Sequence, residues 1–411
     1  MSSKKFDTNF KLMIISKIIS IVGGNVLGFA MILFLVDFTQ SAAMLGIIQS
    51  VSQVPLLFIN PFAGMIADRF DKKKLIVLFD VLKALSNVYL LWLLMTSSYN
   101  IANLTFLRML KMAIISFSGI VFNTSIPSVV NKEQLVAANG IMQSIMAVGL
   151  IGGSVIGGVL FGVLDLETIA IASSVTFLIS AVISMFIKIP YVPRSIDSGI
   201  FAIFKSDIGE SVQFMKNENP IILKLALVTA VITLIFPPIF NTGLPFIVGV
   251  VFDQQVTLSF GIAAIGMLVG GIAAGKLTRL LAIKNLAKWI GAIGIVTISL
   301  SVAFMPIIHS VVIAFWFFNI ALAVLLFIFA LLNSSFGAFM QQVVPSEILG
   351  KVNSLIGLIS LIAGPFGILA VGFLIETVHL PFFFGGLSVL TMVLAFICQW
   401  ILNGYSKEKR K

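Results

Sequence analysis

Two basic residues, Arg108 and Lys111, stand three positions apart inside the apolar stretch 101–125. In a helix that enters a membrane at the first residue of this stretch, Arg108 lies about 10 Å and Lys111 about 15 Å deep, on one face. Charges at that depth are costly and usually mark the path of an ion or a substrate. Two such cations repel each other unless an anion or a water-filled cavity compensates, and the topology brings Asp37 and Glu376 nearest as carboxylates.

Asp37, Arg108 and Lys111 are therefore the predicted proton-coupling residues. The hypothesis is that Asp37, or a neighbouring site, carries an exchanged proton, while Arg108 or Lys111 favours the ionised carboxylate in one conformational state. The proton and a cationic or polar ligand would then compete for one cavity. The alternative is that Asp37 is a solvated loop acid and that Arg108 extends to the outer surface. The depth of Lys111 argues against that alternative.

A second chemical signal is the charged run between residues 64 and 74, which reads GMIADRFDKKK and separates two apolar stretches. A carboxylate at a helix end and nearby cations can form a hydrogen-bonded latch between helices, and a glycine lets another helix approach closely. A plain basic stop-transfer loop is the alternative, although it needs neither Gly nor Asp. The predicted gating motif comprises Gly64, Asp68, Arg69, Lys72, Lys73, Asp80 and Lys83.

Glycines mark the fifth apolar stretch. The predicted motif consists of Gly140, Gly149, Gly153, Gly157 and Gly158, and three of these recur every four residues. This spacing predicts a smooth groove on one helix face that permits tight packing and could bend during a conformational change. Ordinary glycine-mediated helix packing is the alternative.

Uncharged polar residues within the apolar stretches could line a transport cavity, or could only join helices by hydrogen bonds. The cavity candidates are Asn25, Gln53, Gln143, Asn241, Asn319 and Asn333. Pro237, Pro238 and Pro245 predict a break or kink in the stretch 220–250, a common device beside a transport cavity.

The elements that must position these residues are apolar helices. The chain is 59% hydrophobic and 10% charged, which excludes a soluble globular domain. Stretches of about 20 apolar residues suffice to cross a bilayer as helices, so the fold class is an all-α integral membrane protein with twelve transmembrane helices. The predicted spans are 11–36, 44–66, 75–96, 101–125, 136–163, 167–189, 220–250, 256–280, 286–306, 310–341, 350–377 and 382–404.

Basic residues alternate between the links that join these spans. The links near 37–43, 97–100, 164–167, 251–255, 307–309 and 378–381 contain no Lys or Arg. The other links and both termini carry Lys or Arg within them or directly beside them, as with Lys351 after the span 310–341. Because Lys and Arg mark cytoplasmic loops, both termini are predicted to be cytoplasmic. The net charge of +10 is then a signal of topology, with attraction to membrane lipids, and does not indicate a nucleic-acid partner.

A repeat divides the chain. Glu133, Leu135 and Asn139 match Glu347, Leu349 and Asn353 at a common offset of 214 (347 − 133), close to half the length. The predicted domains are an N-terminal six-helix half (1–189), a cytoplasmic linker with an amphipathic segment (190–219) and a C-terminal six-helix half (220–411). Two parallel halves are typical of secondary transporters.

Catalytic chemistry has little support in the sequence. The segment from Gly270 to Lys276 nearly matches a phosphate-binding loop, but Leu277 replaces the required Ser or Thr. His309 and His379 lack metal-ligand spacing, and Cys398 is a single cysteine within an apolar stretch. We therefore expect no enzyme activity, no metal and no cofactor.

The charged run and the glycine motif resemble signatures of the major facilitator superfamily. The run from Gly64 to Lys73 looks like its motif A, and Gly140 to Gly158 looks like motif C of drug:proton antiporters, although Ser154 stands where that motif usually has Pro. Arg108 and Lys111 compete for the basic position of motif B. Further segments resemble bacterial macrolide-efflux exporters, among them Glu133 to Gly140 and Leu349 to Gly357.

This resemblance implies the major facilitator fold and a monomeric, multi-pass transporter in the bacterial cell membrane. The implied function is proton-coupled efflux of amphipathic small molecules, such as macrolides or other drugs, by alternating access between two pseudo-symmetric halves. Export or flipping of a lysophospholipid or siderophore is an alternative, and uptake by symport, a membrane sensor and a membrane enzyme are further ones.

Overall fold

The computed structural model describes residues 6–131, 134–190, 208–252, 256–277 and 282–408. Within these ranges the regular elements are helices and no strand occurs. Eleven described helices are long and apolar enough to cross a membrane, and another helix, Leu135–Phe161, contains a further apolar stretch, Gly152–Phe161. The predicted all-α membrane fold with twelve spans is confirmed.

The chain forms two compact units. Unit 1 contains Met1–Phe38 and Ile48–Ile200, and unit 2 contains Thr39–Ile47 and Phe201–Lys411. Much of the predicted linker, including the part of its amphipathic segment before residue 208, falls at 191–207, outside the described residues. Its described end forms a π-helical turn, Phe214–Glu218.

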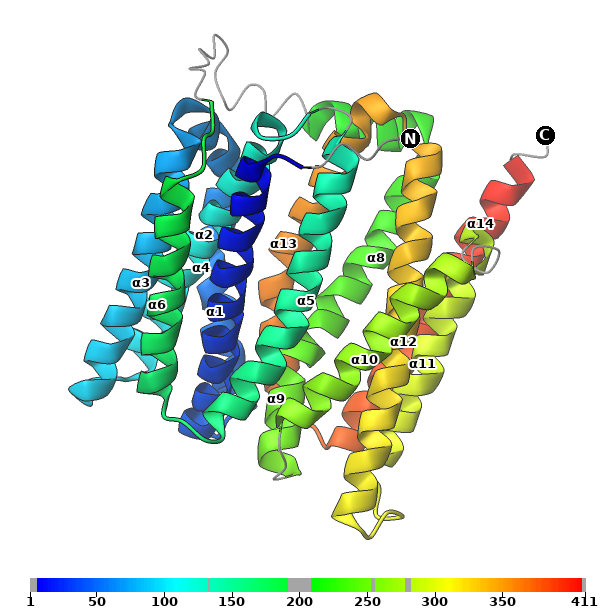
Figure 1. The fold of residues 1–411 in the computed structure, drawn as a ribbon. Coiled ribbons are helices and arrows are strands. Elements are labelled where there is room, and N and C mark those ends of the chain that lie inside the picture. Colours follow the sequence, from blue (N-terminus) through cyan, green and yellow to red (C-terminus); the bar gives the residue numbers. More distant parts are fainter. Residues whose placement is uncertain (1–5, 132–133, 191–207, 253–255, 278–281, 409–411) are drawn as a thin grey trace. The chain divides into compact units, whose positions relative to one another are not determined.

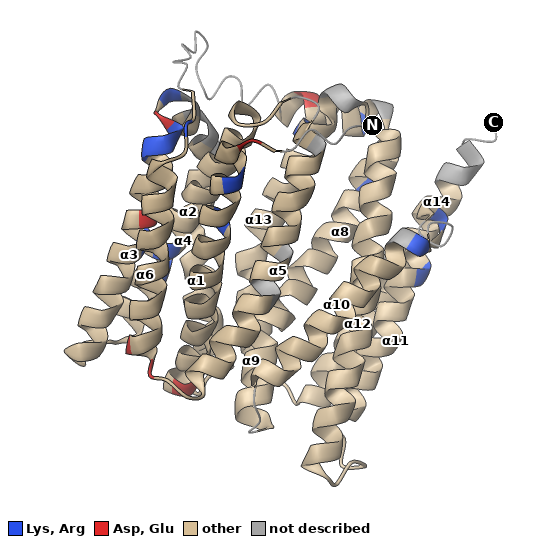
Figure 2. Cartoon of the chain, in the orientation of Figure 1, with Lys and Arg blue, Asp and Glu red and all other residues tan. Residues whose placement is uncertain are grey.

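Six long helices form the first half of the chain (Figure 1). They are α1 (Thr8–Thr39), α2 (Ala42–Arg69), α3 (Lys72–Met95), α4 (Ile101–Ser125), α5 (Leu135–Phe161) and α6 (Leu166–Met185). In unit 1, Figure 2 shows basic residues gathered at the end where α2 meets α3, and acidic residues at the opposite end.

The second half of the chain is also helical. Its helices are α8 (Pro220–Pro238), α9 (Leu244–Phe246), α10 (Val256–Lys276), α11 (Leu286–Val302), α12 (Val311–Val343), α13 (Ser346–Thr377) and α14 (Leu380–Glu408).

The prolines of the seventh span interrupt its regular hydrogen bonding. Beyond Pro238 the chain continues through the π-helical turns Ile239–Gly243 and Ile247–Val251, and 220–251 remains one apolar span. Because proline donates no backbone N–H bond, the turns around it must widen or break. The predicted interruption is therefore present as π-helical turns.

Polar residues at helix starts fix where several spans begin. Asp71 accepts hydrogen bonds from the backbone of Lys73 and Lys74 at the start of α3. Asp165 accepts one from Thr168 at the start of α6, and hydrogen bonds from Thr168 hold the pKa of Asp165 below its usual value. Such caps satisfy backbone N–H groups that have no partner within the helix.

Glycines bring α5 against α1 within unit 1. A Cβ atom at Gly149 would overlap the side chain of Ile21, and one at Gly153 would overlap Asn25. At Gly157 the added Cβ would lie 2.5 Å from the carbonyl oxygen of Val26. Three of the five predicted motif glycines therefore act in close helix packing.

The other two motif glycines are placed differently. Gly140 has open space where a Cβ would stand, and Gly158 is buried.

A similar contact occurs within unit 2. A Cβ at Gly367 of α13 would overlap the carbonyl oxygen of Leu234 in α8. Gly367 follows Gly153 by 214 residues (367 − 153), the offset of the sequence repeat. In unit 1, α5 thus approaches α1 at Gly153. In unit 2, α13 approaches α8 at the corresponding Gly367.

Replacing Gly153 by Ala is expected to lower the free energy of unfolding by about 1–3 kcal/mol, because α5 must move away from α1. The adjacent Gly152 has nothing within 4 Å of an added Cβ, so Gly152→Ala is a matched control and should leave stability unchanged or slightly raised. Thermal unfolding of both variants in detergent measures the difference. Equal midpoints for the two variants would contradict this account of the motif.

Candidate functional site

A pocket lies inside unit 1 among α1, α3, α4 and α6. Its volume is about 80 Å³, which holds several water molecules but is well below the 300–1,000 Å³ typical of drug-sized ligands. The polar lining residues are Lys83, Ser86, Asn87, Arg108, Lys111 and Ser173. The apolar and small lining residues are Gly24, Leu27, Gly28, Met31, Met112, Ile115 and Phe177.

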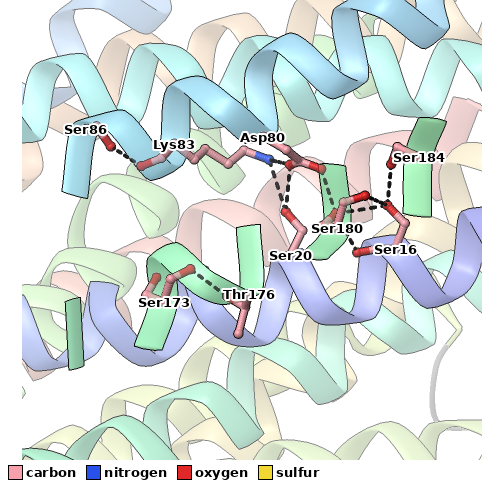
Figure 3. Close-up of polar contacts among 9 residues, drawn as sticks. All are labelled: Ser16, Ser20, Asp80, Lys83, Ser86, Ser173, Thr176, Ser180 and Ser184. Carbon is pink, nitrogen blue, oxygen red and sulfur yellow. Dashed lines mark hydrogen bonds and ion pairs between the residues drawn. The ribbon is translucent and has the colours of Figure 1, made fainter. Parts of the chain in front are cut away.

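One of the lining residues, Lys83, belongs to a buried ion pair. Lys83 Nζ lies 2.8 Å from Asp80 Oδ1, and both residues are on α3, one helical turn apart. Figure 3 shows that Ser20 of α1 and Ser180 of α6 also point toward Asp80, at 3.1 and 2.6 Å. Asp80 therefore accepts three hydrogen bonds, which is what an ionised carboxylate in an apolar interior requires.

The network continues between α1 and α6. Ser16 Oγ lies 2.9 Å from Ser180 Oγ and 2.7 Å from Ser184 Oγ, and Ser180 Oγ also contacts the Ser16 carbonyl oxygen. Small hydroxyl side chains let the helices approach and hydrogen-bond across their interface. As a result α1, α3 and α6 lie side by side (Figure 1) and share the carboxylate of Asp80.

A second polar chain holds Lys111. Lys111 Nζ donates to Asn87 Oδ1 at 2.5 Å, Asn87 Nδ2 donates to Ser173 Oγ at 3.3 Å, and Ser173 Oγ donates to the Gly23 carbonyl oxygen at 2.9 Å. This chain crosses α4, α3, α6 and α1. It fixes the ammonium group of Lys111 at the pocket.

Arg108 lines the same pocket one turn before Lys111 on α4. It is buried, with 8% of its surface exposed, and its Nε atom has no hydrogen-bond partner. Arg108 and Lys111 were predicted to share one helix face, and in the structure both line one cavity.

The predicted carboxylate partners of these cations lie elsewhere. Asp37 is exposed near the end of α1 and is not part of the pocket lining. Glu376, in unit 2, accepts hydrogen bonds from Ser41 Oγ at 2.6 Å and the Ala43 backbone N–H at 2.8 Å. The proton-coupling role of Asp37 therefore stays a prediction.

The predicted gating motif is divided between two places in unit 1. Lys72 Nζ donates to the Thr124 carbonyl oxygen at 2.9 Å, which joins the start of α3 to the end of α4. Arg69 is exposed and Lys73 is half-buried at the same turn. Asp80 and Lys83, by contrast, belong to the buried network beside the pocket. Gly64 and Asp68 are helical residues of α2 whose surroundings lie outside what the structure describes.

The uncharged cavity candidates do not line this pocket. Asn25 packs against Gly153, and Asn319 is fully buried in unit 2 and donates to the Phe315 carbonyl oxygen. Gln53 is half-buried, whereas Gln143, Asn241 and Asn333 are exposed.

Sequence reasoning missed the polar residues that do line the pocket: Ser86, Asn87 and Ser173. Asn87 stands four residues after Lys83, so a helical reading of α3 would have placed it on the face of that charge. Ser173 carried no such signal, because the apolar sixth span contains several serines.

Replacing Asp80 by Ala is expected to lower the free energy of unfolding by about 3–5 kcal/mol, because Lys83 would stay buried without its partner. The exposed pair Lys351–Glu210 provides the control, since Glu210→Gln should change stability by no more than about 1 kcal/mol. Unfolding midpoints in detergent compare them.

The double variant Asp80→Leu with Lys83→Met removes both charges and should be more stable than Asp80→Ala. A loss for Asp80→Ala no larger than that for Glu210→Gln would contradict the importance of the buried pair.

Comparison with known proteins identifies the family. The sequence model described as Major Facilitator Superfamily matches residues 13–368. Macrolide efflux protein A of Streptococcus pyogenes is 22% identical over 387 residues, covering 93% of each chain. The uncharacterized MFS-type transporter YkuC of Bacillus subtilis is 23% identical and covers 97% of this chain and 94% of that protein.

Solved structures agree on the fold. A variant of the nucleoside transporter NupG aligns with a TM-score of 0.71 at 13% identity, covering 96% of this chain and 100% of that one. A bacterial homologue of the iron transporter ferroportin, in its inward-facing state, also aligns at 0.71, with 14% identity and 97% and 98% coverage. The chain belongs to the Major Facilitator Superfamily of membrane transporters.

Proposed function

We propose that this protein is a secondary active transporter that exports amphipathic small molecules by alternating access, with transport coupled to protons. The observation that carries the proposal is the pocket of unit 1, where the buried Arg108 and the half-buried Lys111 meet an apolar lining. Ionisable residues placed inside a membrane domain are costly and are kept where ions or substrates pass. The names of the macrolide efflux relatives support the outward direction.

Among the three coupling candidates, we place the exchanged proton on Lys111. Its ammonium group faces the pocket and donates to Asn87. Release of a proton from Lys111 would end its repulsion with Arg108, three residues earlier on the same helix face. Protonation would thereby change the charge of the pocket and its affinity for a ligand.

Export of a lysophospholipid or siderophore is the second candidate function. It is favoured by the positive charge of the pocket, because Arg108 and Lys111 have no acidic neighbour among the described lining residues. A phosphate or carboxylate would complement that charge.

We also propose that the transporter works as a monomer in the bacterial cell membrane, with both termini in the cytoplasm. The alternation of basic and non-basic links supports this orientation.

Replacing Lys111 by Met should abolish transport driven by an imposed pH gradient while the protein remains folded, because Met keeps the length of the side chain without its charge. The measurement is uptake into proteoliposomes of purified protein, with a macrolide, a dye cation and a lysophospholipid as substrates. Lys224→Met is the matched control, since Lys224 is exposed near the start of α8, and it should transport at the wild-type rate.

Two results would contradict the proposal. Full gradient-driven transport by Lys111→Met would remove Lys111 from coupling. Failure of the wild-type protein to respond to the gradient with any of the three substrates would refute proton coupling itself.

A further inference from the structure

The uncharged hydrogen-bond donors in the unit 1 pocket already donate to other groups of the protein. Ser86 Oγ donates to the Lys83 carbonyl oxygen, Asn87 Nδ2 donates to Ser173 Oγ, and Ser173 Oγ donates to the Gly23 carbonyl oxygen. These hydrogen bonds of the uncharged residues thus run to other groups of the protein. A ligand in the pocket meets few uncharged donors.

Further donors belong to the two cations of α4. Arg108 lines the pocket, and the Nε atom of its guanidinium group is buried and has no acceptor among the described residues. An ammonium group has three protons, of which Lys111 directs one to Asn87. The remaining donors of these two groups call for a ligand that accepts hydrogen bonds.

The charge of the pocket gives the same indication. Asp80 neutralises Lys83 at 2.8 Å. Arg108 and Lys111 have no such partner, because none of the described lining residues is acidic. The positive charges of the buried Arg108 and the half-buried Lys111 would be stabilised by an anion of matching geometry. Guanidinium and ammonium groups bind carboxylates and phosphates in this way. A cationic ligand would meet repulsion instead.

Size and lining define the rest of the ligand. A volume of about 80 Å³ admits a head group and excludes a whole drug-sized molecule. Beside the cations stand apolar side chains, namely Leu27, Met31, Met112, Ile115 and Phe177. An alkyl or aromatic stem attached to the head group would lie against these side chains.

We propose that this pocket binds the oxyanion head group of an amphipathic organic anion, a carboxylate or a phosphate monoester, between the guanidinium group of Arg108 and Lys111 Nζ. The inference rests on the proposed transport function but not on proton exchange, because the inside-negative membrane potential by itself drives an anion outward. It narrows the substrate class from amphipathic molecules in general to anions.

The test is calorimetric titration of purified protein in a neutral maltoside detergent with four probes of one shape: 4-butylbenzoate, 4-butylphenyl phosphate, 4-butylbenzyl alcohol and 4-butylbenzylammonium. Inorganic phosphate is the fifth probe and has no apolar stem. We expect one or both anions to bind at least about tenfold more tightly than the alcohol, the ammonium compound and inorganic phosphate. The better of the two anions tells whether the head group is a carboxylate or a phosphate.

Variants locate the site. Arg108→Gln and Lys111→Met should each weaken binding of the preferred anion about tenfold or more, whereas Arg108→Lys, which keeps the charge, should retain the preference for anions. Lys224→Met should bind as the wild type does, since Lys224 is exposed outside the pocket. Thermal unfolding midpoints identify any variant that fails to fold, and Arg108→Lys then serves as the informative one.

Several results would overturn the proposal. The first is equal binding of the ammonium and carboxylate probes, and the second is anion binding that Lys224→Met weakens as much as Lys111→Met does. Binding of inorganic phosphate as tight as that of 4-butylphenyl phosphate would refute the amphipathic part. Selective anion binding without transport under a pH gradient would support the site while refuting proton coupling, so the two proposals fail separately.

Discussion

The constraint on which the unit 1 structure depends is the cost of charge inside an apolar bundle. Asp80 and Lys83 are buried between helices that otherwise carry apolar and small side chains. Each charge is tolerable because the other is 2.8 Å away and because Ser20 and Ser180 complete the coordination of the carboxylate. The pair thereby ties α1, α3 and α6 together at one depth and holds Lys83 at the lining of the pocket.

Arg108 and Lys111, unlike Asp80 and Lys83, do not form a pair of opposite charges. They lie one turn apart on α4 and face the same pocket, but no carboxylate in the described lining neutralises them. A structural pair would have been completed within the protein, as at Asp80. Their incomplete compensation is the physical reason to assign the pocket a ligand and to separate the stabilising charges of unit 1 from its functional charges.

Close helix contact complements this electrostatic frame. Gly149, Gly153 and Gly157 allow α5 to rest on α1, and Gly367 allows α13 to rest on α8 at the position 214 residues after Gly153. Because apolar helices gain little from burying apolar surface in lipid, small residues and interhelical hydrogen bonds supply much of the specificity of packing. The glycine motif of α5 resembles a signature of transporters, but three of its glycines, Gly149, Gly153 and Gly157, serve close helix packing.

The sequence by itself determined the membrane fold, the span boundaries and the family, because a bilayer requires long apolar helices and the basic links mark their order. It also showed that Arg108 and Lys111 share one helix face, since that relation depends only on helical period. Only the tertiary structure decided which helices supply the rest of the pocket: Lys83 and Asn87 from α3 and Ser173 from α6. Local periodicity shows which residues share a helix face, but the segment that packs against that face depends on contacts between distant parts of the chain. For this reason the sequence placed Asp80 and Lys83 in the predicted gating motif, whereas in the structure they belong to the buried core.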